Sequence, residues 1–263
     1  MKTIGKIVMI ATAVFVSACG SDPFTPDLSG LPLAPLPPIP PPPAANQAPG
    51  GLWYGTLTND MNVVTEEYFA ITTDDARVHL ISVDSEVQFR GALSVTGTEL
   101  SGTVRAFADE GVNWLDSNHV VDSLIVAVIS ERDSISGTWE NASGEDGTFE
   151  FFYDLLHEKD ADTNLLEAVW TGYDDIGNPN VTFTIEADGS FAGQNVQGCT
   201  SSGQLTVIDP AYNLYEVQSQ IANCGISGSY SGLAFLGDVI GVNDALIMSI
   251  DDGTRTILTI LEK

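Results

Sequence analysis

Residues 180–195 read NVTFTIEADGSFAGQN. Apolar and polar residues alternate on both sides of Ala187-Asp188-Gly189, which is the pattern of two half-buried strands joined by a tight turn. The same period of two, broken by Gly, Asn and Asp, continues from Gly51 to Lys263, with almost no apolar residues at helical spacing. The pattern therefore predicts an all-β fold for this part of the chain.

The spacing of the turn residues predicts about eight strands in each half of this region. In the first half we expect strands near 51–58, 66–73, 77–83, 87–94, 99–107, 122–131, 134–140 and 147–154. In the second half we expect them near 166–174, 180–186, 190–195, 201–208, 212–222, 226–236, 244–250 and 254–261. Short connections favour antiparallel neighbours, and eight such strands can close into a barrel without exposed edges.

The chain is therefore predicted to form two consecutive small antiparallel up-and-down β-barrels, at residues 51–155 and 165–263. A single two-sheet β-sandwich is the alternative. The two halves also resemble each other: Leu52-Trp53-Tyr54-Gly55 corresponds to Val169-Trp170-Thr171-Gly172, and Ile135–Trp139 corresponds to Ile226–Tyr230. A duplicated barrel is plausible on this basis, with the acidic segment 154–164 as its connector.

The N-terminal segment has the features of an export signal. Lys2 and Lys6 precede an apolar run at residues 7–18, which ends in small residues before Cys19. Since a membrane-spanning helix needs about 20 apolar residues, this run is too short to be retained as a span. The segment 1–18 is therefore interpreted as a signal peptide.

Val16-Ser17-Ala18-Cys19 resembles the lipobox of bacterial lipoproteins. The resemblance implies cleavage before Cys19 and attachment of several acyl chains to that residue, palmitate among them, which would anchor the protein firmly. Gly20 is not the Asp that retains such proteins at the inner membrane, so we expect the outer membrane, in either leaflet. An ordinary cleaved signal peptide with an incidental Cys19 is the alternative.

Residues 19–50 are expected to form a tether. Eleven of the 13 prolines lie between residues 20 and 50, and proline excludes regular helix and sheet because it fixes φ and lacks an amide donor. An extended polyproline II spacer is therefore predicted. A docking site for a proline-recognising domain is the alternative.

The chain has three cysteines, an odd number that requires an explanation in an exported protein. If Cys19 carries lipid, Cys199 and Cys224 remain. Each lies beside Gly, flanking two expected strands, and an exported protein favours oxidised pairs. We predict a Cys199–Cys224 disulfide.

Composition excludes several function classes. Thirty-six Asp and Glu against nine Lys and Arg give a formal charge of −27, which disfavours binding to nucleic acid or to anionic lipid surfaces. No Gly-x-Ser-x-Gly or phosphate-binding loop is present, and His79, His119 and His157 are too isolated for a zinc motif. No catalytic residue and no cofactor is therefore assigned.

One acidic segment resembles the start of a calcium-binding loop. Asp160-Ala-Asp162-Thr-Asn164 places oxygen ligands at positions one, three and five of an EF-hand. Leu165 stands where the loop requires Gly, however, and Thr171 stands where it requires Glu. No metal site is predicted there.

The tryptophans are divided between core and surface. Trp53 and Trp170, at strand positions, are expected to be core plugs. Trp114, in a loop-like segment, is the best candidate for an exposed ligand or partner contact. A Trp beside Gly at the start of the first strand resembles lipocalin-like and avidin-like barrels, whose indole closes one end, and two lobes on a lipid tether resemble bacterial surface lipoproteins with paired barrels.

These observations favour an outer-membrane lipoprotein that acts as a non-enzymatic binding or interaction module of the cell envelope. Its partners would be the membrane, through the lipid anchor, and an envelope protein. A small-molecule ligand is left open. The alternatives are a periplasmic hydrolase, since paired carboxylates cannot be recognised from sequence distance, a hydrolase inhibitor, and a structural spacer.

Overall fold

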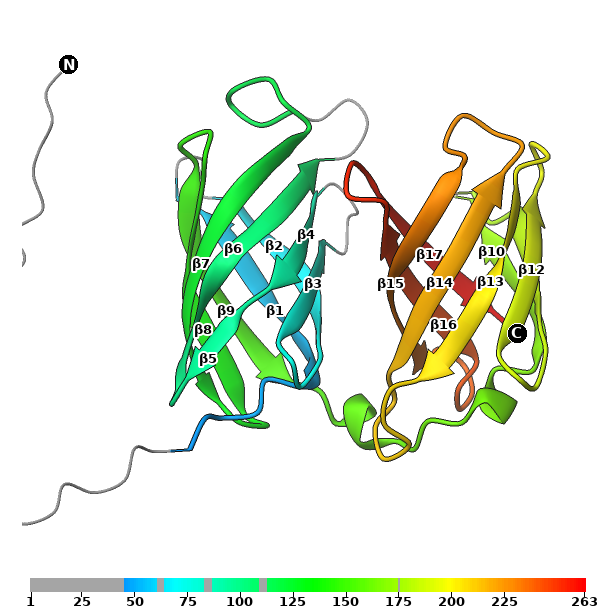
Figure 1. The fold of residues 1–263 in the computed structure, drawn as a ribbon, viewed down its shortest axis with the longest axis horizontal. Helices are drawn as coiled ribbons and strands as arrows, with labels where there is room; N and C mark the ends of the chain where they lie inside the picture. The colour runs from blue at the N-terminus through cyan, green and yellow to red at the C-terminus, as the bar shows by residue number, and fades with distance from the viewer. Residues whose placement is uncertain (1–44, 61–63, 83–86, 109–112, 175) are drawn as a thin grey trace, which may run out of the picture. The chain divides into compact units, whose positions relative to one another are not determined.

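The computed structural model describes residues 45–60, 64–82, 87–108, 113–174 and 176–263. The predicted signal peptide, Cys19 and most of the proline-rich tether lie outside these residues. Figure 1 shows the described chain as two successive barrels, the first coloured blue to green and the second yellow-green to red. In this part of the chain we find no helix with the length and apolar character needed to cross a membrane.

The first barrel is a meander whose sequence neighbours pair in antiparallel fashion. Its strands are β1 (Gly51–Asn59), β2 (Val64–Thr72), β3 (Arg77–Ser82), β4 (Val87–Ala92), β5 (Ser94–Thr96), β6 (Glu99–Ala108), β7 (Val120–Ser130), β8 (Ser134–Asn141) and β9 (Asp146–Tyr153). The barrel closes because β1 pairs with β9 and β4 pairs with β6. The short β5 also pairs with β6 and continues the line of β4, so the two together fill one of eight strand positions.

The second barrel repeats this arrangement with eight strands. They are β10 (Ala168–Tyr173), β11 (Pro179–Ile185), β12 (Ser190–Asn195), β13 (Thr200–Val207), β14 (Tyr215–Ala222), β15 (Gly228–Gly237), β16 (Ala245–Asp251) and β17 (Thr256–Glu262). The barrel closes through a short pairing of β10 with β17, in which Thr171 lies opposite Glu262. The prediction of two eight-stranded antiparallel barrels is confirmed, and the single sandwich is wrong.

The predicted turn at Ala187-Asp188-Gly189 joins β11 to β12. Gly189 has φ +82°, a conformation that L side chains rarely adopt. The Asp188 carboxylate accepts a hydrogen bond from the Ser190 amide at 2.9 Å. This Asp-Gly pair sets the register in which Phe183 lies opposite Gly193.

Each barrel has its own core, built from the inward residues of its strands. Trp53 and Trp170 are both completely buried, as predicted. The Trp53 indole donates to Thr72 Oγ1 at 2.8 Å, and the Trp170 indole donates to the Leu166 carbonyl at 2.7 Å. Because a buried indole N–H needs a partner, these bonds complete the packing of the two rings.

Trp53 and Trp170 occupy the first strand of their barrels, so the first of the two sequence correspondences agrees with the topology. The second correspondence does not. Trp139 lies on β8, the seventh strand position of its barrel, whereas Tyr230 lies on β15, the sixth of its own. Both side chains are buried, so the common pattern reflects a similar packing role on strands that are not equivalent.

The connector between the barrels holds two short 3-10 helices, η1 (Leu155–Glu158) and η2 (Thr163–Leu165). His157 of η1 is buried and stacks on Tyr212, from the loop after β13, with ring centroids 4.7 Å apart. Asn213, the next residue, donates to the carbonyls of Leu156 and Leu236 at 3.2 and 2.7 Å. The connector is therefore fixed to the second barrel by stacking and by hydrogen bonds.

A third apolar cluster joins outward-facing side chains of both barrels. Its buried members are Leu52, Ile71 and Ile81 from the first barrel and Leu214, Leu233 and Phe235 from the second. Ile71 and Ile81 are fully buried although they face away from the first core. The outer surface of β1 to β3 is thus an internal surface of the folded unit.

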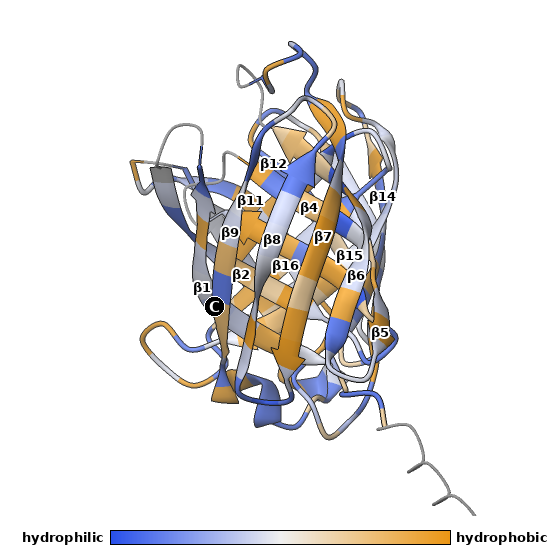
Figure 2. Ribbon diagram, turned by 90° about the vertical axis from the view of Figure 1, so that its left-hand side faces the viewer, coloured by the Kyte–Doolittle hydropathy of each residue, from blue (hydrophilic) through white to orange (hydrophobic). Residues whose placement is uncertain are grey.

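Outward apolar residues also occur where they stay exposed among the described residues. Figure 2 shows β7 as mainly hydrophobic along its length. Its inward residues are buried, whereas Leu124, Val126 and Val128 alternate with them and are about half exposed.

Candidate functional site

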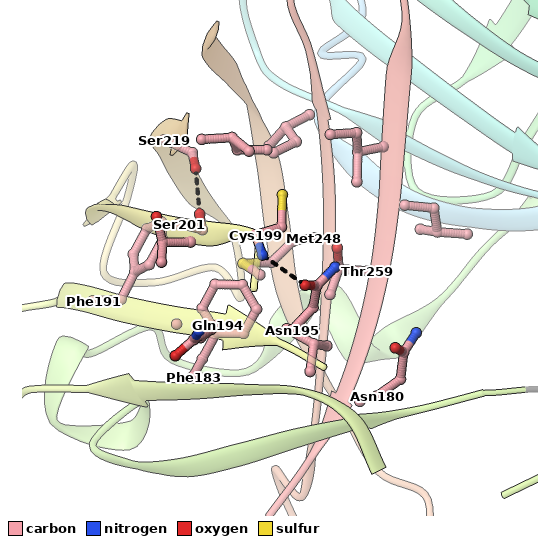
Figure 3. A pocket seen from close by; sticks show the side chains of 18 of the residues that line it. Asn180, Phe183, Phe191, Gln194, Asn195, Cys199, Ser201, Ser219, Met248 and Thr259 are labelled. Atoms are coloured by element: carbon pink, nitrogen blue, oxygen red, sulfur yellow. Dashed lines mark hydrogen bonds between the residues drawn. The ribbon is translucent and has the colours of Figure 1, made fainter. Parts of the chain in front are cut away.

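A cavity of about 280 Å³ lies within the second barrel. Figure 3 shows the rings of Phe183 and Phe191, the side chain of Met248 and two serines around it. The buried apolar residues of its wall are Phe183, Phe191, Val217, Ile221, Met248 and Ile250. A concave, mainly apolar space with a few polar groups is the usual form of a small-molecule site, and the volume of this one is just below the common range of about 300–1,000 Å³.

The cavity exists because several inward positions carry small side chains. Gly172, Gly193, Ser201 and Ser219 all line it. A Cβ added at Gly193 would lie 2.6 Å from a Phe183 ring carbon, so the glycine allows that ring to lie across the strand. The first barrel has three tryptophans in its core, Trp53, Trp114 and Trp139, so large rings occupy its interior.

Two hydroxyl groups provide hydrogen-bonding capacity in the wall of the cavity. Ser201 on β13 and Ser219 on β14 have their Oγ atoms 2.9 Å apart. A serine hydroxyl has one donor and two acceptor sites, so this single bond leaves further hydrogen-bonding capacity on both residues. A ligand in the cavity can therefore be oriented by one hydrogen bond to the pair.

The disulfide between Cys199 and Cys224 is confirmed, with Cα atoms 5.1 Å apart. Cys199 lines the cavity and lies in the turn after β12. The side-chain carbonyl of Asn195 accepts hydrogen bonds from the amides of Gln197 and Cys199, at 3.1 and 2.9 Å. The disulfide therefore ties this ordered turn to the loop that follows β14.

The cavity reaches the surface of the barrel. Among its lining residues, Tyr173 is 48% exposed, Ile226 is 36% exposed and Ile260 is 53% exposed. The wall therefore includes both buried residues and residues that face solvent.

The described lining consists of apolar, hydroxyl, amide and aromatic groups, with neither a carboxylate nor a cationic side chain among them. A charged ligand would lose its hydration there without gaining a counter-ion, which is costly. The chemistry of the wall therefore fits an uncharged, mainly apolar ligand.

Trp114 lies in a loop, as predicted, but the prediction that it is exposed is wrong. The side chain is only 8% exposed and belongs to the first core, with its ring 6.3 Å from that of Phe89. Trp114 and Ser117 form a tight turn in which the Ser117 amide donates to the Trp114 carbonyl at 2.8 Å. This turn places the indole inside the barrel, while the neighbouring Leu115 is exposed.

The remaining polar candidates are dispersed. His79 and His157 are buried at separate places, and His119 is exposed. Asp162, from the segment that begins like a calcium loop, caps η2 by accepting hydrogen bonds from the Asn164 amide and side chain at 2.9 and 2.8 Å. Within the described residues, no cluster of three or more His, Cys, Asp or Glu side chains is arranged to hold a metal ion.

The cavity was not among the features predicted from the sequence. Its signal is a set of small residues at inward positions, Gly172, Gly193, Ser201 and Ser219. The first barrel also has small residues in its core, Ala70, Ala106 and Ala127, but its tryptophan rings occupy the interior. That signal becomes visible only after the four strands are placed in register, because each small residue is unremarkable within its own strand.

Comparison with known proteins gives no family. No protein-family model matches the chain, and no protein with a curated description matches it. Among solved structures, a crystal structure of a Bacteroides fragilis protein described as a "putative outer membrane protein" aligns with 81% of this chain and 94% of its own, at 12% sequence identity and a TM-score of 0.30. A TM-score of this size does not establish a shared fold, and no function is inferred from the match.

Proposed function

We propose that this protein is a lipid-anchored component of the bacterial outer membrane whose second barrel binds a small, uncharged and mainly apolar molecule without transforming it. The observation that carries the binding function is the 280 Å³ cavity with an apolar wall and the Ser201–Ser219 hydroxyl pair. The anchor rests on the sequence Val16-Ser17-Ala18-Cys19.

The two barrels would have different tasks. The first has an interior occupied by large rings and would act as a rigid support that packs on the second through the Ile71 and Ile81 cluster. The second barrel contains the cavity that would bind the ligand. Binding is favoured over hydrolysis because the described wall offers hydroxyl, amide and aromatic groups, whereas acid–base catalysis needs a positioned titratable group.

The tether would allow the barrels to work at a distance from the lipid. An extended polyproline chain rises about 3.1 Å per residue, so residues 19–50 would hold the barrels several tens of Å from the membrane surface. A tethered binding module of this kind would sample the space next to the membrane.

The binding function is tested with the full chain carrying Cys19→Ser, which prevents acylation. N-phenyl-1-naphthylamine, an uncharged apolar dye that brightens on leaving water, should bind saturably with one site per chain. Ser201→Leu should weaken binding at least about tenfold, because leucine fills the cavity. Ser202→Leu is the matched control, since Ser202 is exposed on the other face of β13. Absence of saturable binding, or equal effects of the two variants, would overturn the proposal.

A further inference from the structure

Arg90 is a buried cation between the two barrels. It lies on β4 of the first barrel and is only 5% exposed. Its Nη2 donates to Gln88 Oε1 at 2.6 Å and to the hydroxyl of Ser249, on β16 of the second barrel. Its Nε and Nη1 are buried and have no hydrogen-bond partner within the described residues. A buried guanidinium with unsatisfied donors is costly unless something else accepts them.

The charge on Arg90 persists at neutral pH. Burial lowers the pKa of its guanidinium to about 9, and the nearby carboxylate of Asp251 opposes that shift. At pH 7 the group is therefore still protonated. Asp251 acts on it electrostatically but makes no ion pair with it in the described structure, so the positive charge lacks a direct counter-ion.

His79 is a second buried group with an unused polar atom. It lies directly opposite Arg90 in the β3–β4 pairing, and cross-strand neighbours have Cβ atoms about 4.5–5.5 Å apart. Desolvation and the charge of Arg90 hold the pKa of the imidazole well below its usual value, so the ring is neutral. It is hydrogen-bonded to the backbone of Ser249, which uses its single N–H, and the unpartnered Nδ1 is an acceptor.

Both groups line a pocket of about 440 Å³ with walls from both barrels. Arg77 and Arg105 line it as well, and so do the carboxylates of Asp122, Glu216 and Asp251. Arg77 is paired with Glu216 at 3.3 Å, and Arg105 is paired with Asp122 at 3.9 Å. Among the described residues, Arg90 is therefore the cation of this pocket that has no carboxylate partner within ion-pair distance.

We propose that this pocket binds a phosphate group, free or as a monoester, which accepts hydrogen bonds from Nε and Nη1 of Arg90. A phosphate that retains one O–H also supplies the donor that Nδ1 of His79 lacks. Sulfate has the same shape but carries no proton at neutral pH, so it satisfies Arg90 and not His79. The site needs both barrels, and it is separate from the cavity of the second barrel.

The proposal is tested by isothermal titration calorimetry at pH 7 and constant ionic strength. Inorganic phosphate is titrated into the full chain that carries the Cys19→Ser substitution. Saturable binding of one phosphate per chain is expected, at least about fivefold tighter than sulfate. Arg90→Gln should weaken it at least about tenfold. Arg255→Gln is the charge-matched control, because Arg255 is paired with Asp252 outside the pocket, and it should leave binding unchanged.

Asp251→Asn keeps the experiment decisive if Arg90→Gln does not fold. The substitution removes a negative charge next to the site and retains the oxygen that accepts from the Gly253 amide at 3.0 Å, so phosphate should bind several-fold more tightly. An unchanged or lower affinity, no saturable binding by the parent chain, or equal losses in Arg90→Gln and Arg255→Gln would overturn the proposal. Dye binding to the cavity of the second barrel should be the same with and without phosphate, which separates the two sites.

Discussion

The Oγ atoms of Ser201 and Ser219 lie 2.9 Å apart inside the second barrel. They face a cavity, whereas the interior of the first barrel is filled by Trp53, Trp114 and Trp139. Two barrels with the same number of strand positions thus differ in the volume of the side chains that point inward.

Removal of the disulfide should loosen the cavity. Cys199→Ser together with Cys224→Ser opens a bridge across 25 residues, and the chain-entropy relation gives a loss of about 3 kcal/mol in the free energy of unfolding. Urea denaturation measures the loss, and dye affinity should fall as well, because Cys199 lines the cavity. Two free thiols in the unfolded, unreduced Cys19→Ser chain would contradict the bridge itself.

The cluster between the barrels should contribute as much as an ordinary core. Ile71→Ala removes a fully buried side chain, and substitutions of this kind cost about 2–5 kcal/mol. Val126→Ala is the control: Val126 also points away from the first core but is 49% exposed, so its effect should stay within about 0.5 kcal/mol. Similar small effects of both substitutions on urea denaturation would show that the barrels do not pack through Ile71.

Lowering the pH should reduce the free energy of unfolding even before the carboxylates become protonated. Burial lowers the pKa of His157 below its usual value of 6.5, against the opposing charges of Glu158, Asp74 and Asp209, while Arg132 adds to the shift. The unfolded chain therefore binds more protons than the folded one below about pH 6.5, so the free energy of unfolding falls as the pH falls through that window.

His79 acts in the same direction, because its pKa is also lowered. The effect is measured by urea denaturation at pH 7 and pH 5. His157→Gln should reduce the difference between the two pH values, because it removes one of the two rings that are buried as neutral groups. Greater stability at pH 5 than at pH 7 would contradict the burial of these rings as neutral groups.

The lipid anchor has a direct test. Cys19→Ala should abolish incorporation of labelled palmitate and release the protein from the membrane fraction, because several acyl chains provide firm attachment. The barrels should fold as before, since Cys199 and Cys224 form their own bridge. Continued labelling and membrane association of Cys19→Ala would show that another segment holds the protein.

Sequence reasoning was reliable where the local pattern determines the structure. The alternation along residues 190–195 coincides with β12, and the Asp188-Gly189 turn is where it was expected. The disulfide was also predictable, because the predicted export signal implies an oxidising location and Cys199 and Cys224 flank neighbouring expected strands.

Other features depend on contacts that no single segment contains. The exposure of Trp114 depends on the direction in which its loop turns, and the burial of Ile71 and Ile81 depends on a neighbouring barrel. The segment Arg77–Ser82 is buried on both faces. Its outer face is buried because the second barrel packs against it, and the local sequence alone does not indicate this contact. The cavity depends on the register of four strands at once.

The central claim is that the second barrel binds an apolar ligand inside it. It is tested most directly by methyl NMR of the Cys19→Ser chain during titration with N-phenyl-1-naphthylamine. The methyl signals of Met248 and Ile221, which line the cavity, should shift saturably, and those of Ile125 and Ile129 in the first core should not move. Saturable shifts confined to Ile125 and Ile129, or no shifts at Met248 and Ile221, would contradict the account.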